Sequence, residues 1–160
     1  TMQLECGVDA CTDPGATATD GNGDPLPVQS YNSGNDEYGP GPDPSVESSH
    51  YIYYDTHDEE WNYASASRTV IVKDTLAPTL TLNGDATMSI PCYSDFDAMD
   101  PGTTSSDHCY GDLTDQVLKT SNVQNWVAGT YTVTYTVQDS AGHAATAGTR
   151  TGNVVDCPVN

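Results

Sequence analysis

The chain carries an internal repeat, and this repeat decides how many domains the sequence must be divided into. Residues 1–6 (TMQLEC) return as residues 87–92 (TMSIPC). Each of these segments is followed by an Asp-Pro-Gly tripeptide, at residues 13–15 and at residues 100–102. A self-similar period of this size indicates one domain that has been copied in tandem.

The end of each copy repeats as well. The dipeptide Arg-Thr at residues 68–69 returns at residues 150–151. We therefore expect two domains in the 160-residue chain, one over residues 1–74 and one over residues 75–160. Bodies this small bury a modest fraction of their surface and often need disulfides or metal ions as additional support.

Strand signals dominate the chain, and helix signals are absent. Residues 131–137 (YTVTYTV) alternate in the pattern of a half-buried strand, and residues 79–82 (TLTL) alternate likewise before an Asn-Gly turn. Residues 115–119 (DQVLK) are also expected to form a strand. Short strands between Gly, Pro, Asn and Asp turns indicate an all-β fold of two sandwiches. Residues 31–49, with three glycines and three prolines, are expected to form a long loop.

Composition places the chain outside the cytosol. Five cysteines in a chain with four lysines and arginines fit an oxidising, extracellular setting. The formal net charge of −19 excludes the basic footprint of a nucleic-acid-binding protein, and no apolar run has the length of a membrane span. So much negative charge either attracts divalent cations or serves solubility, and both interpretations stay open.

Several motifs together resemble a known family. They are residues 13–20 (DPGATATD), residues 129–135 (GTYTVTY), residues 139–143 (DSAGH) and the LECG tetrapeptide at residues 4–7. They resemble bacterial-type Ig-like repeats of surface proteins and the related hyalin-repeat domains. The resemblance implies two tandem extracellular Ig-like β-sandwiches used as stalks, adhesive modules or fibre units, without catalytic activity. Residues 58–62 (DEEWN) depart from the family's Asp-x-Ala-Gly-Asn turn and imply a bulkier one.

The carboxylates themselves also argue against an enzyme. They are scattered over turns, and the sequence offers no nucleophile–base pair and no phosphate-binding loop to organise them.

The two copies differ at their beginnings. Residues 75–86, which open the second copy, have no counterpart before Thr1, so the first domain is expected to lack its first strand. An open sheet edge is a template for another chain, and strand addition from a neighbour would produce a head-to-tail filament. The alternatives are that the chain is a fragment, or that copies pack end to end without strand exchange. The residues expected at the contact between subunits are Thr1, Met2, Cys157, Pro158, Val159 and Asn160.

The cysteines are expected to follow the repeat. Hyalin-like repeats have the spacing of Cys92 and Cys109, and the resemblance implies that these two pair. The first copy has no cysteine at the position of Cys109, so Cys6 is expected to pair with the nearby Cys11. Cys157 remains, either for a disulfide between subunits or as a free thiol.

Acidic turns suggest calcium. Residues 20–24 (DGNGD) place oxygen-bearing side chains at alternate positions between glycines, which is the spacing of calcium-binding loops. The alternative is an ordinary Asx/Gly turn in solvent. The candidate calcium ligands are Asp13, Asp20, Asn22, Asp24, Asp58, Asp74, Asp107, Asp112, Asp139 and Asp156.

An aromatic cluster suggests a second function. Tyr51, Tyr53, Trp61 and Tyr63 stand among carboxylates and histidines, a combination that suits sugar rings. The alternative is that alternate tyrosines are buried in the core and the others lie on a sheet edge.

These observations predict a structural subunit of an extracellular filament or surface stalk, assembling head-to-tail with copies of itself. Calcium and O-linked glycans on Thr/Ser-rich faces are further expectations. The alternative function is a carbohydrate-binding adhesin module of a cell-surface protein.

Overall fold

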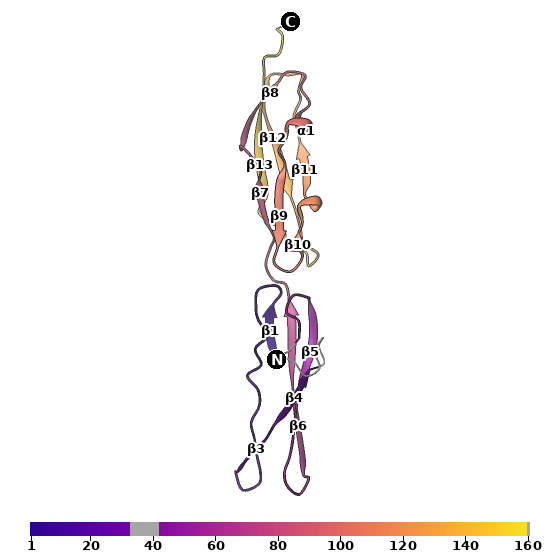
Figure 1. The fold of residues 1–160 in the computed structure, drawn as a ribbon. Coiled ribbons are helices and arrows are strands. Elements are labelled where there is room, and N and C mark those ends of the chain that lie inside the picture. The colour runs from indigo at the N-terminus through magenta and orange to yellow at the C-terminus, as the bar shows by residue number, and fades with distance from the viewer. Residues whose placement is uncertain (33–41, 160) are drawn as a thin grey trace. The chain divides into compact units, whose positions relative to one another are not determined.

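The computed structural model describes residues 1–32 and 42–159, which form two compact units, Thr1–Thr75 (unit 1) and Leu76–Asn160 (unit 2) (Figure 1). The expected domain boundary lies one residue before the boundary between these units. The described residues are almost entirely strands and turns, which confirms the all-β prediction and is consistent with Ig-like β-sandwiches.

Unit 2 consists of two sheets. The larger sheet holds four strands, in the order β11 (Leu118–Ser121), β12 (Gly129–Thr136), β13 (Gly148–Val155) and β8 (Thr87–Pro91). The smaller sheet holds three strands, in the order β10 (Gly111–Asp112), β9 (Thr103–Asp107) and β7 (Thr79–Leu82). The β12–β13 and β7–β9 pairs are antiparallel, whereas β8 runs parallel to β13.

The core of unit 2 follows from strand alternation. Val133 and Tyr135 point inward from β12, and they pack with Ile90, Phe96 and Val154. Leu80 and Leu82, the two alternate leucines of β7, cover this core from the smaller sheet. A leucine pair two residues apart is what a strand needs in order to bury one face.

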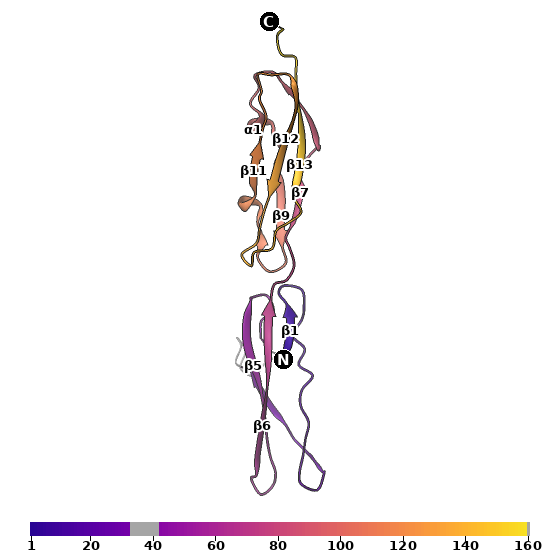
Figure 2. The same cartoon turned by 180° about the vertical axis from the view of Figure 1, so that it is seen from behind.

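The described residues of unit 1 have the same arrangement with one strand fewer. Its larger sheet has the order β1 (Met2–Glu5), β6 (Tyr63–Lys73), β5 (Ser48–His57) and β4 (Gln29–Asn32), and β1 runs parallel to β6 as β8 does to β13. In the part of unit 1 that the structure describes, the smaller sheet consists of β2 (Ala18–Thr19) and β3 (Pro25–Leu26). Figure 2 shows β1, β5 and β6 of this sheet from the other side. Among the described residues of unit 1, no strand takes the place of β7.

Two local predictions need correction. Residues 115–119 do not form one strand, because Thr114–Gln116 make a 3₁₀ turn (η1) before β11 begins at Leu118. A four-residue helix, α1 (Phe96–Met99), is present although no helix was expected. Asp95 caps its first turn by accepting the Asp97 N–H, and the burial of Phe96 anchors it. The loop expected at residues 31–49 is described only outside residues 33–41, and β4 and β5 occupy its two ends.

Both predicted disulfides are wrong. Cys92 is bonded to Cys157, with 4.9 Å between their Cα atoms, and Cys11 is a free thiol. Cys6 and Cys109 are disulfide-bonded. The parallel pairing of β8 and β13 explains the first bond: Pro91 lies opposite Val155, so the cysteines that follow the two strands come together at one end of the sheet. Cys157 is therefore not available for the disulfide between subunits that the sequence suggested.

Candidate functional site

A buried arginine organises unit 2. The Arg150 side chain is fully buried, and its Nε lies 3.3 Å from Asp100 Oδ1. Its Nη2 donates to the carbonyls of Asn83 (2.8 Å) and Gly102 (3.1 Å), and its Nη1 donates to the carbonyl of Asp85. The guanidinium thus joins β13 both to the Asp-Pro-Gly turn and to the turn after β7.

Tyr135 completes this network from β12. Its hydroxyl donates to Asp100 Oδ2 at 2.7 Å and accepts from Arg150 Nε at 3.4 Å. Burial, and then the bond to Asp100, raise the pKa of the Tyr135 hydroxyl. Burial would also raise the pKa of Asp100, but hydrogen bonds from Tyr135, the Gly102 N–H and Lys119 lower it below the usual value.

Unit 1 repeats this network with its own residues. Arg68 Nε lies 3.4 Å from Asp13 Oδ1 and donates to the Tyr54 hydroxyl at 3.1 Å. Arg68 Nη2 donates to the Gly15 carbonyl at 3.1 Å, and Tyr54 donates to Asp13 Oδ1. Burial, and then the bond to Asp13, raise the pKa of Tyr54, as they do for Tyr135. The quartet Arg68, Tyr54, Asp13 and Gly15 therefore corresponds to Arg150, Tyr135, Asp100 and Gly102.

The two arginines differ in what else surrounds them. Arg150 also binds the Asn83 and Asp85 carbonyls after β7, and its side chain is 0% exposed. The Arg68 side chain is 29% exposed, and in the described part of unit 1 no carbonyls replace those two. In unit 2 these two acceptors belong to the turn that follows β7.

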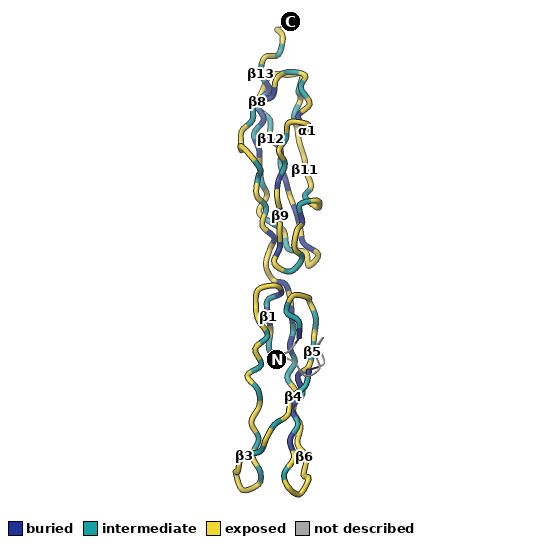
Figure 3. Tube along the Cα trace, in the orientation of Figure 1, coloured by how far each residue is buried: buried dark blue, intermediate teal, exposed yellow. Residues whose placement is uncertain are grey.

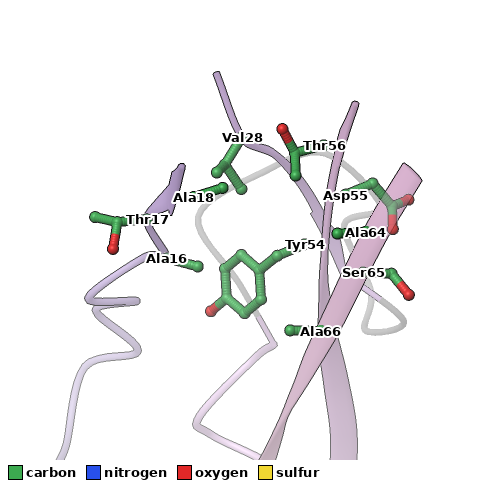
Figure 4. Close-up of a pocket in the computed structure, with 10 residues that line it drawn as sticks. All are labelled: Ala16, Thr17, Ala18, Val28, Tyr54, Asp55, Thr56, Ala64, Ser65 and Ala66. Atoms are coloured by element: carbon green, nitrogen blue, oxygen red, sulfur yellow. The ribbon is translucent and has the colours of Figure 1, made fainter. Parts of the chain in front are cut away.

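A groove opens in unit 1 beside this network. It has a volume of about 120 Å³ and is lined by small side chains around the Tyr54 ring. Figure 4 shows the ring between Ala16 and Ala18 on one side and Ala66 on the other, while Asp55 and Ser65 point away from it. The remaining lining residues are Thr17, Val28, Thr56 and Ala64.

Comparison with unit 2 explains why the groove exists. In unit 2, Gly148 stands two residues before Arg150, as Ala66 does before Arg68, and a Cβ on Gly148 would lie 2.7 Å from Leu80 Cδ2. The corresponding space in unit 2 is therefore filled by the leucines of β7. The same space in unit 1 is open among the described residues.

Burial along the matching strands agrees with this comparison. Thr103, Ser105 and Asp107 on β9 are all buried. Their counterparts after the Asp-Pro-Gly turn of unit 1 are less covered: Ala16 is exposed and Ala18 is only half-buried. In Figure 3 the chain of unit 1 between β1 and β3 is coloured mostly as exposed and intermediate. A face that alternation directs toward the core is thus partly open to solvent.

The edge of β2 presents backbone groups outward. Asp20 donates its N–H to the Asp24 carbonyl, toward β3. Because neighbouring residues of a strand direct their N–H and C=O groups to opposite sides, the amides of Thr17 and Thr19 face the other way. In unit 2 the matching residues, Thr104 and Ser106, lie opposite Thr81 and Thr79 of β7.

Several of the aspartates named as calcium ligands accept hydrogen bonds from backbone N–H groups of their own turns. Asp20 Oδ1 accepts the N–H groups of Asn22 and Asp24. Asp58 accepts those of Glu60 and Asn62, and hydrogen bonds from Asn62 lower its pKa. The remaining candidates are placed as follows: Asp107 and Asp112 cap the turns after β9 and β10, Asp139 accepts the His143 N–H, Asp74 is buried, and Asp156 has a positive φ of 61°. Calcium binding stays a prediction of the sequence.

The aromatic residues divide between two faces of β5. Tyr54 points into the groove, whereas Tyr53 lies on the opposite face and stacks on Tyr31 with ring centroids 5.1 Å apart. Tyr51 joins this pair at 6.1 Å. Trp61, 77% exposed, stacks on His57 at the β5–β6 turn. Tyr51 and Tyr53 of the predicted cluster therefore lie on the outer face of β5, whereas the neighbouring Tyr54 is buried on the other face.

The residues expected at the contact between subunits are only partly assembled. Met2, the residue after Thr1, pairs with Val70 at the start of the β1–β6 ladder. Cys157 is bonded within the chain, and Val159 is 99% exposed. Asn160, which follows Pro158 and Val159, lies outside the described residues.

Sequence reasoning missed the residues that define the groove, namely the Arg–Tyr–Asp network and the alanines at 16, 18 and 66. A signal was present, because the repeated Arg-Thr and Asp-Pro-Gly motifs hold the two ends of the network.

Comparison with known proteins gives a family match for unit 2. Residues 80–154, just under half of the chain, match the family model described as "Bacterial surface protein, Ig-like domain". Unit 2 is similar to bacterial surface Ig-like domains. The match supports a cell-surface module, and this class of domain is typically non-enzymatic.

Among solved structures, the crystal structure of the lipoprotein BT2262 from Bacteroides thetaiotaomicron is 25% identical, with a TM-score of 0.44, and the alignment covers 52% of this chain. The chain spans only 40% of that lipoprotein's length. No curated protein matches the chain. The part of the chain that the structure describes holds no helix long and apolar enough to cross a bilayer.

Proposed function

We propose that this chain is a structural module of an extracellular filament or surface stalk, and that it assembles head-to-tail with copies of itself. Unit 1 is then a second Ig-like sandwich whose open edge is covered by a neighbouring subunit. The observation that carries this proposal is the matched pair of networks: Arg150 is sealed by β7 and its turn, whereas Arg68 has the same core partners and an open flank.

The physical argument concerns an exposed edge. Unpaired N–H and C=O groups along a strand favour pairing with another chain, and proteins normally protect such edges. The outward amides of Thr17 and Thr19, beside a groove lined by alanines, form an edge of this kind. The net charge of −19 keeps unassembled copies soluble, so assembly through this edge is expected to strengthen when salt screens the repulsion.

Sedimentation velocity and negative-stain electron microscopy over increasing protein concentration test the proposal. We expect linear oligomers that lengthen with concentration and with moderate salt. Thr17→Pro removes the outward amide directly before β2 and should abolish these oligomers, because proline cannot donate to an added strand.

Ser121→Pro is the matched control. Ser121 lies on β11, an edge strand of unit 2, and the neighbouring Asn122 donates to Thr132 of β12, so the Ser121 amide faces outward as well. Assembly that is lost in Ser121→Pro and kept in Thr17→Pro would show that the contact lies on unit 2 and not on unit 1, contrary to the proposal. A monomer at all concentrations would contradict self-assembly.

One observation favours the adhesin as a second candidate. Trp61 and Tyr63, 77% and 65% exposed, lie near a hollow of about 280 Å³ that is lined by Gln29, Asp55, His57 and Tyr63 among others. Exposed rings beside carboxylate and amide groups suit a sugar. Glycan-array binding that is lost in Trp61→Ala and kept in Trp126→Ala, which changes an exposed tryptophan of unit 2, would support this candidate.

A further inference from the structure

We propose that the hollow beside the β5–β6 turn of unit 1 binds an amino sugar with a free ammonium group, presented as one unit of a glycan chain. The inference rests on the second candidate function, the adhesin, and names the class of sugar that its site takes. The Asp55 carboxylate holds the ammonium group, and the exposed face of Trp61 receives the sugar ring.

Strand register puts the hollow on the outer face of the larger sheet. Gln29 lies opposite Asp55, and His57 lies opposite Tyr63. Side chains two residues apart share one face of a strand, so Asp55 and His57 point the same way from β5. Figure 4 shows Asp55 directed away from the buried Tyr54. The first four residues line the hollow, and its volume of about 280 Å³ suits one sugar unit rather than a folded partner.

Trp61 stands at a position that unit 2 gives to a glycine. The turns at residues 58–62 and 139–143 have the same two hydrogen bonds: the first residue donates to the carbonyl of the fifth, and the fourth donates to the carbonyl of the first. The fourth residue is Gly142, with a φ of 98°, in unit 2 and Trp61, with a φ of 65°, in unit 1. A side chain at positive φ costs conformational free energy that glycine avoids. Such strain directs attention to what the indole ring does.

The Trp61 ring is held in place and open on one side. One of its faces stacks on the His57 ring, with centroids 4.3 Å apart and planes 15° apart. Asp58 fixes the turn by accepting the N–H groups of Glu60 and Asn62. Trp61 is nevertheless 77% exposed, so its second face is available to a ligand. An indole face packs against the C–H groups of a sugar ring, and it attracts cations more strongly than the other aromatic rings do.

The surroundings of the hollow are acidic. Asp55 lines it, and the adjoining turn carries Asp58, Glu59 and Glu60. Among the described residues that line the hollow, none is lysine or arginine. An ammonium group gains more than a hydroxyl group from Asp55, because charge-assisted hydrogen bonds are roughly twice as strong as neutral ones. An anionic sugar would be repelled by these carboxylates and by the net charge of −19.

Gln29 and Tyr63 favour a sugar over other cations. The Gln29 amide lines the hollow and offers both donors and an acceptor to hydroxyl groups. The Tyr63 hydroxyl donates to Asp55, which raises the pKa of Tyr63 and leaves further lone pairs of the carboxylate for a ligand. A lysine side chain has an ammonium group but no hydroxyl groups for Gln29. An amino sugar has partners for Asp55, Gln29 and Trp61 together.

The first probe is the hexasaccharide of chitosan, in which every sugar carries a free amine, and its binding to the full chain is measured by isothermal calorimetry. We expect saturable binding that is about tenfold tighter, or more, than binding of the N-acetylated hexasaccharide of chitin, because acetylation removes the charge that Asp55 recognises. Equal binding of the two hexasaccharides, or no binding of the chitosan probe, would overturn the inference.

Asp55→Asn tests the carboxylate. It should weaken binding of the chitosan hexasaccharide about tenfold or more, since a neutral amide takes the place of the charged acceptor. Asp115→Asn is the matched control, because it removes the same charge from an exposed aspartate of unit 2, and it should leave binding unchanged. Equal losses of affinity in the two variants would reduce the effect to net charge and overturn the site.

Trp61→Gly tests the ring without endangering the turn, because unit 2 has glycine at this position. It should abolish measurable binding and leave the circular dichroism spectrum of the chain unchanged. Trp126→Ala, which changes an exposed tryptophan of unit 2, should bind like the parent. Binding that survives in Trp61→Gly would contradict the role of the indole face. Tetralysine that binds as tightly as the hexasaccharide would reject the sugar as the ligand.

The outcomes also separate this inference from the functions proposed above. Equal affinity for the chitin and chitosan hexasaccharides keeps the adhesin and rejects the amino sugar. Binding of no glycan rejects both. Preferential binding of the chitosan hexasaccharide by a chain that stays monomeric keeps the inference and rejects self-assembly.

Discussion

Arg150 and Asp100 form an ion pair inside unit 2, with Nε and Oδ1 3.3 Å apart and side chains only 0% and 3% exposed. Breaking a buried pair by removing one partner leaves an uncompensated charge, which is strongly destabilising. This relationship gives the most direct predictions about stability.

Arg150→Met should destabilise unit 2 by about 3–5 kcal/mol, because Asp100 stays buried and the Asn83 and Asp85 carbonyls lose their donor. Arg68→Met is the matched variant in unit 1, and it should cost less because the Arg68 side chain is already 29% exposed. Urea titration followed by segment-resolved hydrogen exchange measures each unit in the full chain. Equal losses of unfolding free energy in the two units would show that the greater exposure of Arg68 does not reduce its contribution to stability.

Acid should destabilise unit 2 through Asp100. Its pKa is lowered in the folded state by hydrogen bonds from Tyr135, the Gly102 N–H and Lys119, which outweigh burial. The stabilisation is therefore present above the unfolded pKa of about 3.9 and is lost as pH falls through the lower folded value.

The check on Asp100 is a series of unfolding midpoints between neutral pH and pH 2. Asp100→Asn should be less stable than the parent at pH 7 and should lose less of its stability on acidification. Tyr135→Phe should reduce the same acid dependence, because it removes a donor to Asp100 Oδ2. Identical pH profiles for all three proteins would contradict the role given to Asp100.

The Cys92–Cys157 disulfide should stabilise unit 2. It closes a loop with a sequence separation of 65, for which the chain-entropy model gives a contribution of about 4 kcal/mol. The double variant Cys92→Ser, Cys157→Ser should lose a large part of this in chemical denaturation. Cys11→Ser is the control, since Cys11 is a free thiol, and it should behave like the parent. A double variant as stable as Cys11→Ser would show that parallel strand pairing alone holds this end of the sheet.

Gly152 on β13 has no room for a side chain. A Cβ there would lie 2.7 Å from Ile90 Cδ1, although unit 1 has Val70 at the matching register position opposite Met2. Gly152→Val should therefore destabilise unit 2 by about 1–3 kcal/mol through overpacking.

Ile90→Ala should relieve part of the Gly152→Val penalty in the double variant, so that the two losses are not additive in thermal unfolding. Strictly additive losses would mean that the added methyl groups do not meet Ile90.

The sequence was informative where a pattern is local. Alternation at residues 79–82 and 131–137 correctly indicated β7 and most of β12, because each strand must bury one face. Residues 115–119 (DQVLK) were wrongly predicted to form one strand, because a 3₁₀ turn of three residues is too short to leave a periodic pattern in the sequence.

Long-range pairings could not be predicted in this way. The Cys92–Cys157 bond depends on which strand lies next to β13, and the residues of β8 that pair with β13 are 64 positions away from their partners in the sequence (for example 151 − 87 = 64). The groove was equally hidden, because alanines at positions 16, 18 and 66 mean nothing until β2 and β6 face each other across the Tyr54 ring. The repeat nevertheless located the place where the two copies differ.

Amide hydrogen exchange at Thr17 and Thr19 tests the open edge of unit 1 most directly, with Thr104 and Ser106 of unit 2 as internal references. In dilute monomer we expect rapid exchange at the first two amides and slow exchange at the references, which pair with β7. In assembled material all four should exchange slowly. Slow exchange of Thr17 and Thr19 in the monomer, or rapid exchange of both in the assembly, would contradict an edge that a neighbouring chain completes.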